Sequence, residues 1–120
     1  TVLFVGRVSE LKNVLGLMRA FRESTAKIKD AELRIAGDTK DYAYTQTCMD
    51  YAHKYGLNVR FLGNVDRERL THELSTASCL ALVSRQETAP IVIGEAMASG
   101  VPVVASNICG IPYMVTEGTT

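Results

Sequence analysis

Short runs of apolar residues alternate along the chain with longer segments in which apolar positions recur every third or fourth residue. The first run, Val2 to Val5, is unbroken, which is typical of a strand buried on both faces of a parallel sheet. Later apolar runs also predict buried strands. The predicted strands are Val2–Val5, Ala31–Ala36, Val59–Leu62, Cys79–Val83 and Val101–Ala105.

The segments between these runs have the spacing of helices. A helix with one buried face is predicted after Asn13, from the apolar positions Val14, Leu17, Met18 and Phe21. Gly56 suits the end of a second helix, and Asp66 can cap the start of a third by accepting from its first N–H groups. These second and third helices are predicted over Tyr44–Tyr55 and Arg67–Thr76. A fourth is predicted over Pro90–Ser99, and a last helical turn from Ile111 toward Glu117.

Strand and helix therefore alternate along the whole chain, with no internal sequence repeat. This order predicts an α/β fold: a Rossmann-like three-layer domain with an open parallel sheet of about five strands and helices on both faces. In such folds, ligands bind beyond the carboxyl ends of the strands. The polar residues expected at that edge are Arg7, Lys12, Asp38, Asn64, Ser84–Glu87 and Ser106–Gly110.

Composition narrows the classes of function. The 120 residues are enough for one domain with its own core. Thirteen basic residues balance thirteen acidic ones, so no charge pattern indicates binding to nucleic acid or to an anionic membrane. No apolar run approaches the ~20 residues of a membrane span. The chain starts directly on a predicted strand without Met, and we expect it to be a piece of a longer protein.

Several familiar kinds of site have no support. The three cysteines, Cys48, Cys79 and Cys109, are odd in number and widely spaced, which favours core positions in a reducing cytoplasm over disulfides or a metal site. His53 and His72 fall within predicted helices, where a solvated or packing role is expected. Neither a G-x-G-x-x-G fingerprint nor a P-loop is present. We therefore expect chemistry that needs no metal and no cofactor.

The stretch from Ser84 to Ser106 holds the strongest candidate for chemistry. If its helix begins near Pro90, the carboxylates of Glu87 and Glu95 both reach the space above the helix N-terminus. Free N–H groups there can hold a phosphate, and carboxylates can accept from sugar hydroxyls. Two alternatives stay open: stabilisation of the helix dipole alone, or the acid and base of a hydrolase.

Arg7 and Lys12 follow the first predicted strand and reach the same edge of the sheet. An Arg offers a planar fork to phosphate oxygens and a Lys a mobile point charge, so the pair can neutralise a diphosphate. The alternative is that both are solvated loop residues paired with Glu10 or Asp38.

Taken together, these segments resemble the C-terminal half of the retaining GT-B glycosyltransferases of glycosyltransferase family 4. The resemblance runs through FVGRVSELKN, LRIAGD, VRFLGNV, SRQETAPIVIGEAMASGVPVVAS and CGIPYMV. Its most specific part is an E-x(7)-E pattern, met by ETAPIVIGE and followed by AMASGVPVV. The resemblance implies the C-terminal half of a GT-B fold, with the acceptor site largely on an N-terminal domain.

The resemblance also implies a role for each matching residue. Arg7 and Lys12 would hold the donor diphosphate, Glu87 the transferred sugar and Glu95 the ribose. Main-chain N–H groups from Thr88 to Val92 would meet the phosphates or sugar, and Gly63 to Val65 would lie against the base. The expected catalytic residues are Arg7, Lys12 and Glu87. The expected donor-binding residues are Gly6, Arg7, Lys12, Gly63, Asn64, Val65, Glu87, Thr88, Ala89, Ile91, Val92 and Glu95.

Three positions depart from the family pattern. Pro90 removes one N–H donor from a segment that is often E-G-F-G in relatives. Asn13 stands where a glycine is frequent, and Cys109 precedes Gly110 where two glycines are common. These departures leave the sugar and the base unassigned.

The function expected from the resemblance is donor binding in a retaining glycosyltransferase. The full-length enzyme would move a hexosyl group from a UDP-, GDP- or ADP-sugar to a glycan or lipid acceptor, in bacterial-type polysaccharide or glycolipid synthesis, and the fragment alone would be inactive. We expect it in the cytoplasm, with peripheral placement at the inner membrane face as an option. The alternatives are another GT-B nucleotide-sugar enzyme, an epimerase or hydrolase, or a flavodoxin-like binding or regulatory module.

Overall fold

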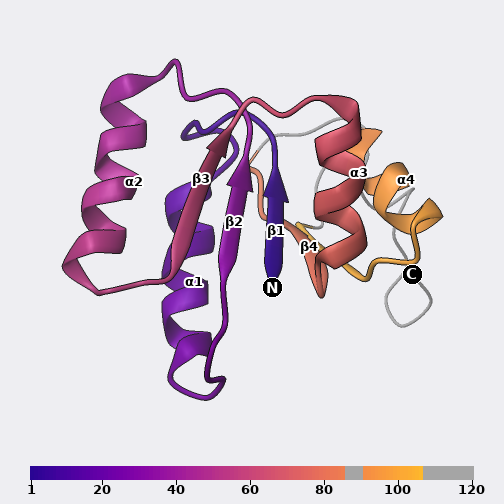
Figure 1. The fold of residues 1–120 in the computed structure, drawn as a ribbon. Coiled ribbons are helices and arrows are strands. Elements are labelled where there is room, and N and C mark those ends of the chain that lie inside the picture. The colour runs from indigo at the N-terminus through magenta and orange to yellow at the C-terminus, as the bar shows by residue number, and fades with distance from the viewer. Residues whose placement is uncertain (86–90, 107–120) are drawn as a thin grey trace.

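The computed structural model describes residues 1–85 and 91–106, which form a parallel sheet covered by helices (Figure 1). The strands are β1 (Val2–Val5), β2 (Leu33–Ala36), β3 (Val59–Gly63), β4 (Cys79–Leu82) and β5 (Val103–Ala105). The helices are α1 (Val14–Thr25), α2 (Tyr42–Lys54), α3 (Arg67–Thr76) and α4 (Ile91–Ala98). All neighbouring strands are parallel, in the order β3-β2-β1-β4-β5. The predicted α/β fold is confirmed.

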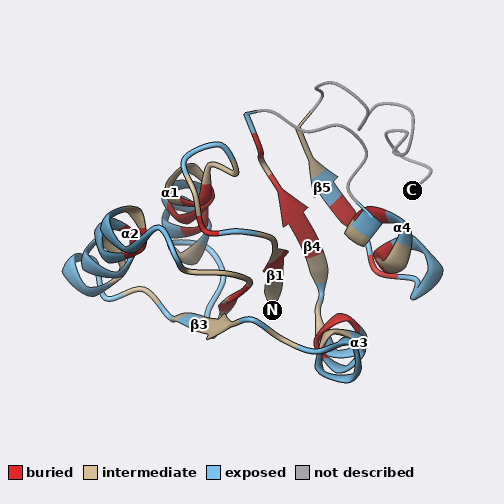
Figure 2. Ribbon diagram, turned by 90° about the horizontal axis from the view of Figure 1, so that it is seen from above, coloured by how far each residue is buried: buried red, intermediate tan, exposed pale blue. Residues whose placement is uncertain are grey.

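The helices form two layers. Helices α1 and α2 lie on one face of the sheet and α3 and α4 on the other (Figures 1 and 2). Right-handed crossovers require this arrangement, because the chain moves from β1 outward to β3 and then returns past β1 to β4 and β5. The central strands are the most buried, and Leu3, Phe4 and Leu80 are fully inaccessible to solvent. The carboxyl ends of β1 and β4 therefore stand on a rigid core.

The helix signals of the sequence are confirmed. The buried face of α1 consists of Val14, Leu17, Met18 and Phe21. The Asp66 carboxylate caps α3 by accepting from the Arg69 N–H at 2.7 Å. Gly56 ends α2 with a φ of 59°, and the Leu57 N–H reaches back to the Ala52 carbonyl at 2.9 Å.

Two strands begin two residues later than predicted: β2 starts at Leu33 and not at Ala31, and β5 at Val103 and not at Val101. Gly100 has a φ of 72°, and the Val101 N–H donates to the Ala96 carbonyl at 2.9 Å. Val101 is thus part of the turn that closes α4, and its side chain packs in the core without belonging to the sheet. The helical turn predicted from Ile111 lies outside the described residues.

The cysteine and histidine predictions are consistent with the structure. Cys48 is fully buried, and burial raises the pKa of its thiol to about 11, which keeps it protonated and unreactive. Cys79 is half-buried, and Cys109 lies outside the described residues. His53 and His72 are exposed. Within residues 1–85 and 91–106, no helix combines the length and the apolar character required to cross a bilayer.

A carboxylate is buried where α3 packs on the sheet. Glu73 is only 3% exposed, and its two oxygens accept from Arg34 Nη1 at 2.9 Å and from Arg69 Nε at 2.8 Å. Burial alone would raise the pKa of Glu73, but the hydrogen bonds from Arg69 and Arg34 outweigh it and hold the pKa below its ordinary value. The charged part of this contact between α3 and β2 is therefore present only while Glu73 is ionised, whereas Arg34 also donates to Thr76 Oγ1 on α3 at 3.0 Å.

We expect a Glu73→Gln variant to be about 2 kcal/mol less stable at pH 7, because Arg69 loses its carboxylate partner and Arg34 keeps only Glu32. Since the folded-state pKa of Glu73 is lowered, its contribution is complete above the unfolded-state pKa of about 4.3 and is lost as the pH falls through the folded-state pKa. Urea unfolding of both proteins from pH 7 to pH 3 should show the gap closing at the acid end. A constant gap would mean that packing, and not charge, sets the difference.

Candidate functional site

The strand order changes direction between β1 and β4, which marks the binding edge in open α/β sheets. The two strands pair only near their amino ends, at Val2 with Cys79 and Leu3 with Leu80. By contrast, β1 pairs with β2 along its whole length, from Val2 to Val5. Regular pairing of β1 with β4 thus stops before their carboxyl ends, and we call this part of the edge, onto which Figure 2 looks, the β1–β4 split.

The segments that follow β1 and β2 lie in close contact with each other. Gly6 donates its N–H to the Ala36 carbonyl at 2.9 Å, and Val8 donates to the Asp38 carbonyl at 2.9 Å. Gly6 and Gly37 face each other so closely that a Cβ on Gly37 would lie 1.8 Å from the Gly6 carbonyl oxygen. The ladder between the two strands thereby continues past their ends, and it fixes the backbone of Arg7 at the edge of the sheet.

Arg7 lies against an acidic residue from the neighbouring strand exit. Its Nε is 3.7 Å from Asp38 Oδ2, and the second carboxylate oxygen of Asp38 accepts from the Lys40 N–H at 2.7 Å. The Arg7 side chain is 66% exposed and that of Asp38 19%. The pairing with Asp38 that the sequence left open is therefore present, while most of the guanidinium surface still faces solvent. An exposed ion pair of this kind is weak enough for a ligand anion to compete.

Lys12 is half-buried in the loop between β1 and α1, and this loop is tied to the residues after β4. The Arg85 N–H donates to the Leu11 carbonyl at 2.8 Å, and the Arg85 guanidinium lies 3.2 Å from Glu10. Glu10 thus has a partner in Arg85, a pairing that the sequence did not indicate. These contacts join the two chain segments that border the split.

The N-terminus of α1 receives a side-chain acceptor from α2. Asn13 precedes the helix without capping it, and the Leu15 N–H instead donates to the Tyr44 hydroxyl at 2.9 Å. Burial raises the pKa of Tyr44, so this hydroxyl stays neutral. One N–H group of the first turn of α1 is therefore already occupied by a neutral protein acceptor.

Helix α4 follows β4, so its N-terminus lies at the carboxyl edge. Ile93 and Ala96 are buried and anchor the helix, Val92 and Glu95 are half-buried, and Ile91 is 79% exposed. Glu95 is thus a half-buried residue of a helix that the core anchors through Ile93 and Ala96. Glu87, Thr88 and Ala89 lie outside the described residues, as does Pro90, so their roles stay predictions.

The loop after β3 reaches the same edge from farther away. Gly63 has a φ of 69°, and its carbonyl accepts from the Gly37 N–H at 2.8 Å. Asn64 is exposed and Val65 half-buried. Because β2 stands between β3 and β1, this loop lies two strands from the split. The site residues of the described chain therefore spread from the split toward β3.

Sequence reasoning missed the contacts that hold the site together. Asn13, identified only as a departure from a glycine, donates its side-chain amide to the Val83 carbonyl at 3.1 Å. Arg85, expected at the edge without a specified partner, connects to Glu10 and Leu11. Residue spacing could not predict these pairs, because their members are far apart in sequence. Asn13 and Val83 are separated by 70 residues, and Arg85 and Glu10 by 75.

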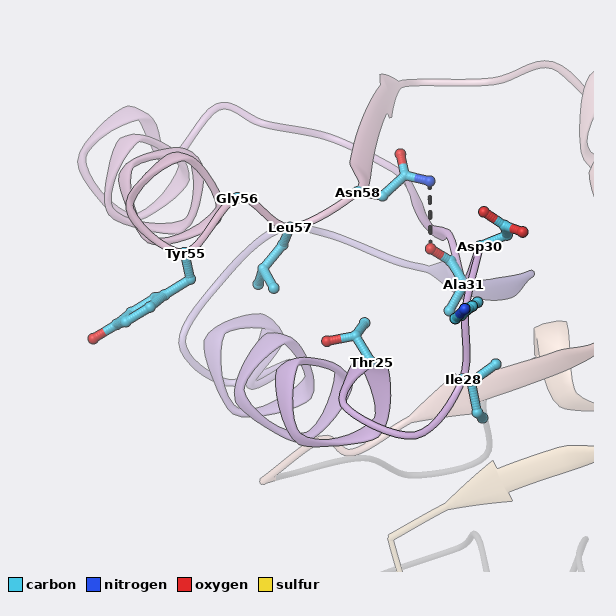
Figure 3. A pocket seen from close by; sticks show the side chains of 9 residues that line it. Thr25, Ile28, Asp30, Ala31, Tyr55, Gly56, Leu57 and Asn58 are labelled. Atoms are coloured by element: carbon cyan, nitrogen blue, oxygen red, sulfur yellow. Dashed lines mark hydrogen bonds between the residues drawn. The ribbon is translucent and has the colours of Figure 1, made fainter.

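A hollow of about 410 Å³ lies at the opposite, amino edge of the sheet (Figure 3). It is formed where α1 and α2 end, and Asn58 bridges to the Ala31 carbonyl beside it at 3.3 Å. None of the predicted site residues borders it. Among the described residues, no cluster of three or more His, Cys, Asp or Glu side chains could hold a metal ion.

Known proteins with similar sequences share this architecture. The chain is 32% identical to the D-inositol 3-phosphate glycosyltransferase of Corynebacterium diphtheriae, over 98% of the chain and 29% of that protein. The fold of Anabaena HepE, solved in complex with UDP-glucose, matches with a TM-score of 0.88 at 25% identity, over 98% of this chain and 32% of that one. Sucrose-phosphate synthase from Thermosynechococcus elongatus matches with a TM-score of 0.84 at 29% identity, over 96% of this chain and 29% of that one.

The chain thus spans less than a third of the length of these relatives. A family comparison agrees with them and covers residues 1–120 under the description Glycosyl transferases group 1. With the strand order, the β1–β4 split and these similarities in agreement, the chain belongs to the Glycosyl transferases group 1 family.

Proposed function

We propose that this chain is the donor-binding domain of a retaining glycosyltransferase, which transfers a hexosyl group from a nucleotide diphosphate sugar to a glycan or lipid acceptor. One observation carries the proposal: the fold closely matches a protein solved with UDP-glucose, and Arg7 and Lys12 follow β1 at the carboxyl edge of this fold. Two cationic side chains and a helix N-terminus on one edge suit a diphosphate.

The chemistry assigned to Arg7 and Lys12 is stabilisation of the leaving group. When the bond between the anomeric carbon and the phosphate oxygen breaks, that oxygen keeps the electron pair and gains negative charge. Fixed positive charges beside it lower the barrier because they interact more strongly with the transition state than with the intact donor. In this proposal these two side chains neutralise the departing diphosphate without a metal ion.

The other predicted residues orient the donor. Glu87 accepts from hydroxyls of the transferred sugar and Glu95 from the ribose, while the backbone from Gly63 to Val65 lies against the base. A UDP-, GDP- or ADP-sugar fits this scheme equally well. The acceptor binds to another part of the full-length enzyme, which we place in the cytoplasm in the synthesis of a polysaccharide or glycolipid.

Calorimetric titration of the full-length protein with UDP, GDP and ADP tests the proposal. We expect one of the three to bind, and an Arg7→Ala variant to bind it about tenfold more weakly, as the loss of one charge-assisted hydrogen bond implies. Arg19→Ala is a matched control, since Arg19 is an exposed arginine on α1.

The control should bind the nucleotide as the unmodified protein does. If the folded protein binds none of the three nucleotides, the proposal is wrong. If both arginine variants weaken binding alike, a general effect of charge replaces the assigned role of Arg7.

A further inference from the structure

A side-chain hydrogen bond joins the segments beyond the point where the pairing of β1 and β4 stops. The strands pair only as far as Leu3 and Leu80. Beyond that point, the Asn13 side-chain amide donates across the split to the Val83 carbonyl, at 3.1 Å. Asn13 directly follows Lys12 in sequence, and Val83 directly follows β4. The bond therefore spans the gap between the segment that carries Lys12 and the segment that leads to α4.

The backbone at this position suits asparagine. Asn13 has a φ of 55° and a ψ of 42°, a left-handed conformation that glycine and asparagine adopt most readily. Of the two, only asparagine has an amide that can reach the Val83 carbonyl. The side chain does not cap α1, since Tyr44 supplies that acceptor. The Asn13 side chain is therefore available to connect the loop after β1 with the end of β4.

Gly16 makes room for the Asn13 side chain. A Cβ on Gly16 would lie 2.5 Å from Asn13 Oδ1 and 2.6 Å from its Nδ2. Gly16 lies within the first turn of α1, where an alanine would favour the helix. The two residues act together: the Asn13 amide bonds the residue after β4, and the absence of a side chain at Gly16 leaves the space that the Asn13 side chain occupies.

We propose that Asn13 is a positioning residue of the donor site. Its amide sets the separation between the loop that carries Lys12, which holds the diphosphate, and the end of β4, which leads to α4 and Glu95. The proposal rests on the proposed function. Its specific consequence is that a ligand contacting both sides of the split depends on Asn13 more than a ligand contacting the diphosphate side alone.

The test compares Asn13→Gly and Asn13→Asp in the full-length protein. Glycine keeps the backbone conformation without the amide, and aspartate keeps the shape but cannot donate. We expect kcat for sugar transfer to fall about tenfold in both, because small misplacements of reacting groups are costly, whereas the Kd for inorganic diphosphate, which has no ribose to meet Glu95, changes less than about twofold.

Asn58→Gly is the matched control. Asn58 also bridges two segments through an amide-to-carbonyl bond, at 3.3 Å to Ala31, but at the opposite edge of the sheet (Figure 3). We expect it to lower the melting temperature by about 2 to 4 °C, as Asn13→Gly does, without changing kcat. Activity losses that track stability alike in all three variants would overturn the proposal.

Amide hydrogen exchange provides a readout without ligand. The Arg85 N–H, which bonds the Leu11 carbonyl across the split, should exchange at least about fivefold faster in Asn13→Gly and at its normal rate in Asn58→Gly. Unchanged exchange at Arg85 overturns the proposal even if the protein binds no nucleotide. Absence of nucleotide binding by the unmodified protein, with faster exchange in the variant, contradicts the proposed function alone.

Discussion

Replacing Gly37 with alanine is expected to destabilise the protein by about 3 kcal/mol. The φ of Gly37 is 151°, which side chains with a Cβ rarely adopt, and the new Cβ would lie 1.8 Å from the Gly6 carbonyl oxygen. That oxygen is backbone, so relief requires the exits of β1 and β2 to move apart. Urea unfolding monitored by circular dichroism measures the loss.

Two other glycines separate the causes. Gly56 has a φ of 59° but no atom within 4 Å of the place that a Cβ would take, so Gly56→Ala should cost only about 1 kcal/mol for the backbone conformation. Gly94 in α4 likewise has free space and no positive φ, so Gly94→Ala should be neutral or stabilising by up to about 1 kcal/mol. If Gly37→Ala is no more harmful than Gly56→Ala, the two loops separate easily and do not fix Arg7.

Replacing Lys12 with alanine is expected to lower kcat/KM for sugar transfer by about 10²- to 10³-fold in the full-length enzyme. Under the proposed function, this change removes a positive charge beside the departing diphosphate. The loop around Lys12 is anchored on both sides, by Leu11 to Arg85 and by Asn13 to Val83, so a neighbouring charge cannot easily take its place. Steady-state kinetics with a radiolabelled donor measure the effect.

Lys40→Ala is the control for this experiment. Lys40 is an exposed lysine that follows β2 at the same edge of the sheet, and its contact with Asp38 uses the backbone N–H, which alanine retains. Its loss should change kcat/KM by no more than about twofold, because exposed charges are screened by salt. A Lys12→Ala enzyme with near-normal turnover would remove Lys12 from the diphosphate site.

Much of the fold follows from local patterns. Unbroken runs such as Val2–Val5 identify buried parallel strands, and the spacing of Val14, Leu17 and Phe21 gives the buried face of α1. Errors arise where an apolar residue serves another element. Val101 is as apolar as the strand that follows, but its N–H closes the end of α4, and periodicity cannot show where a backbone hydrogen bond goes.

The candidate site is predictable in position but not in its internal connections. Parallel strands bring their carboxyl ends to one edge, which is enough to place the segments that follow β1 and β4, with Arg7, Lys12 and Arg85, there. The partners of these segments depend on tertiary structure. Nothing near Asn13 in sequence indicates Val83, and a left-handed backbone conformation at an asparagine becomes visible only in the structure.

The limited pairing of β1 with β4 also bears on how the chain folds. Strands β1, β2 and β3 with α1 and α2 form a unit whose neighbouring strands are joined by single crossovers, whereas the bond from Thr1 to Ser78 closes a loop of 77 residues. Loop closure over such a distance is costly before other contacts form. The first half of the chain can therefore assemble during synthesis before β4 emerges from the ribosome, and the ligand-binding edge is completed when β4 joins β1.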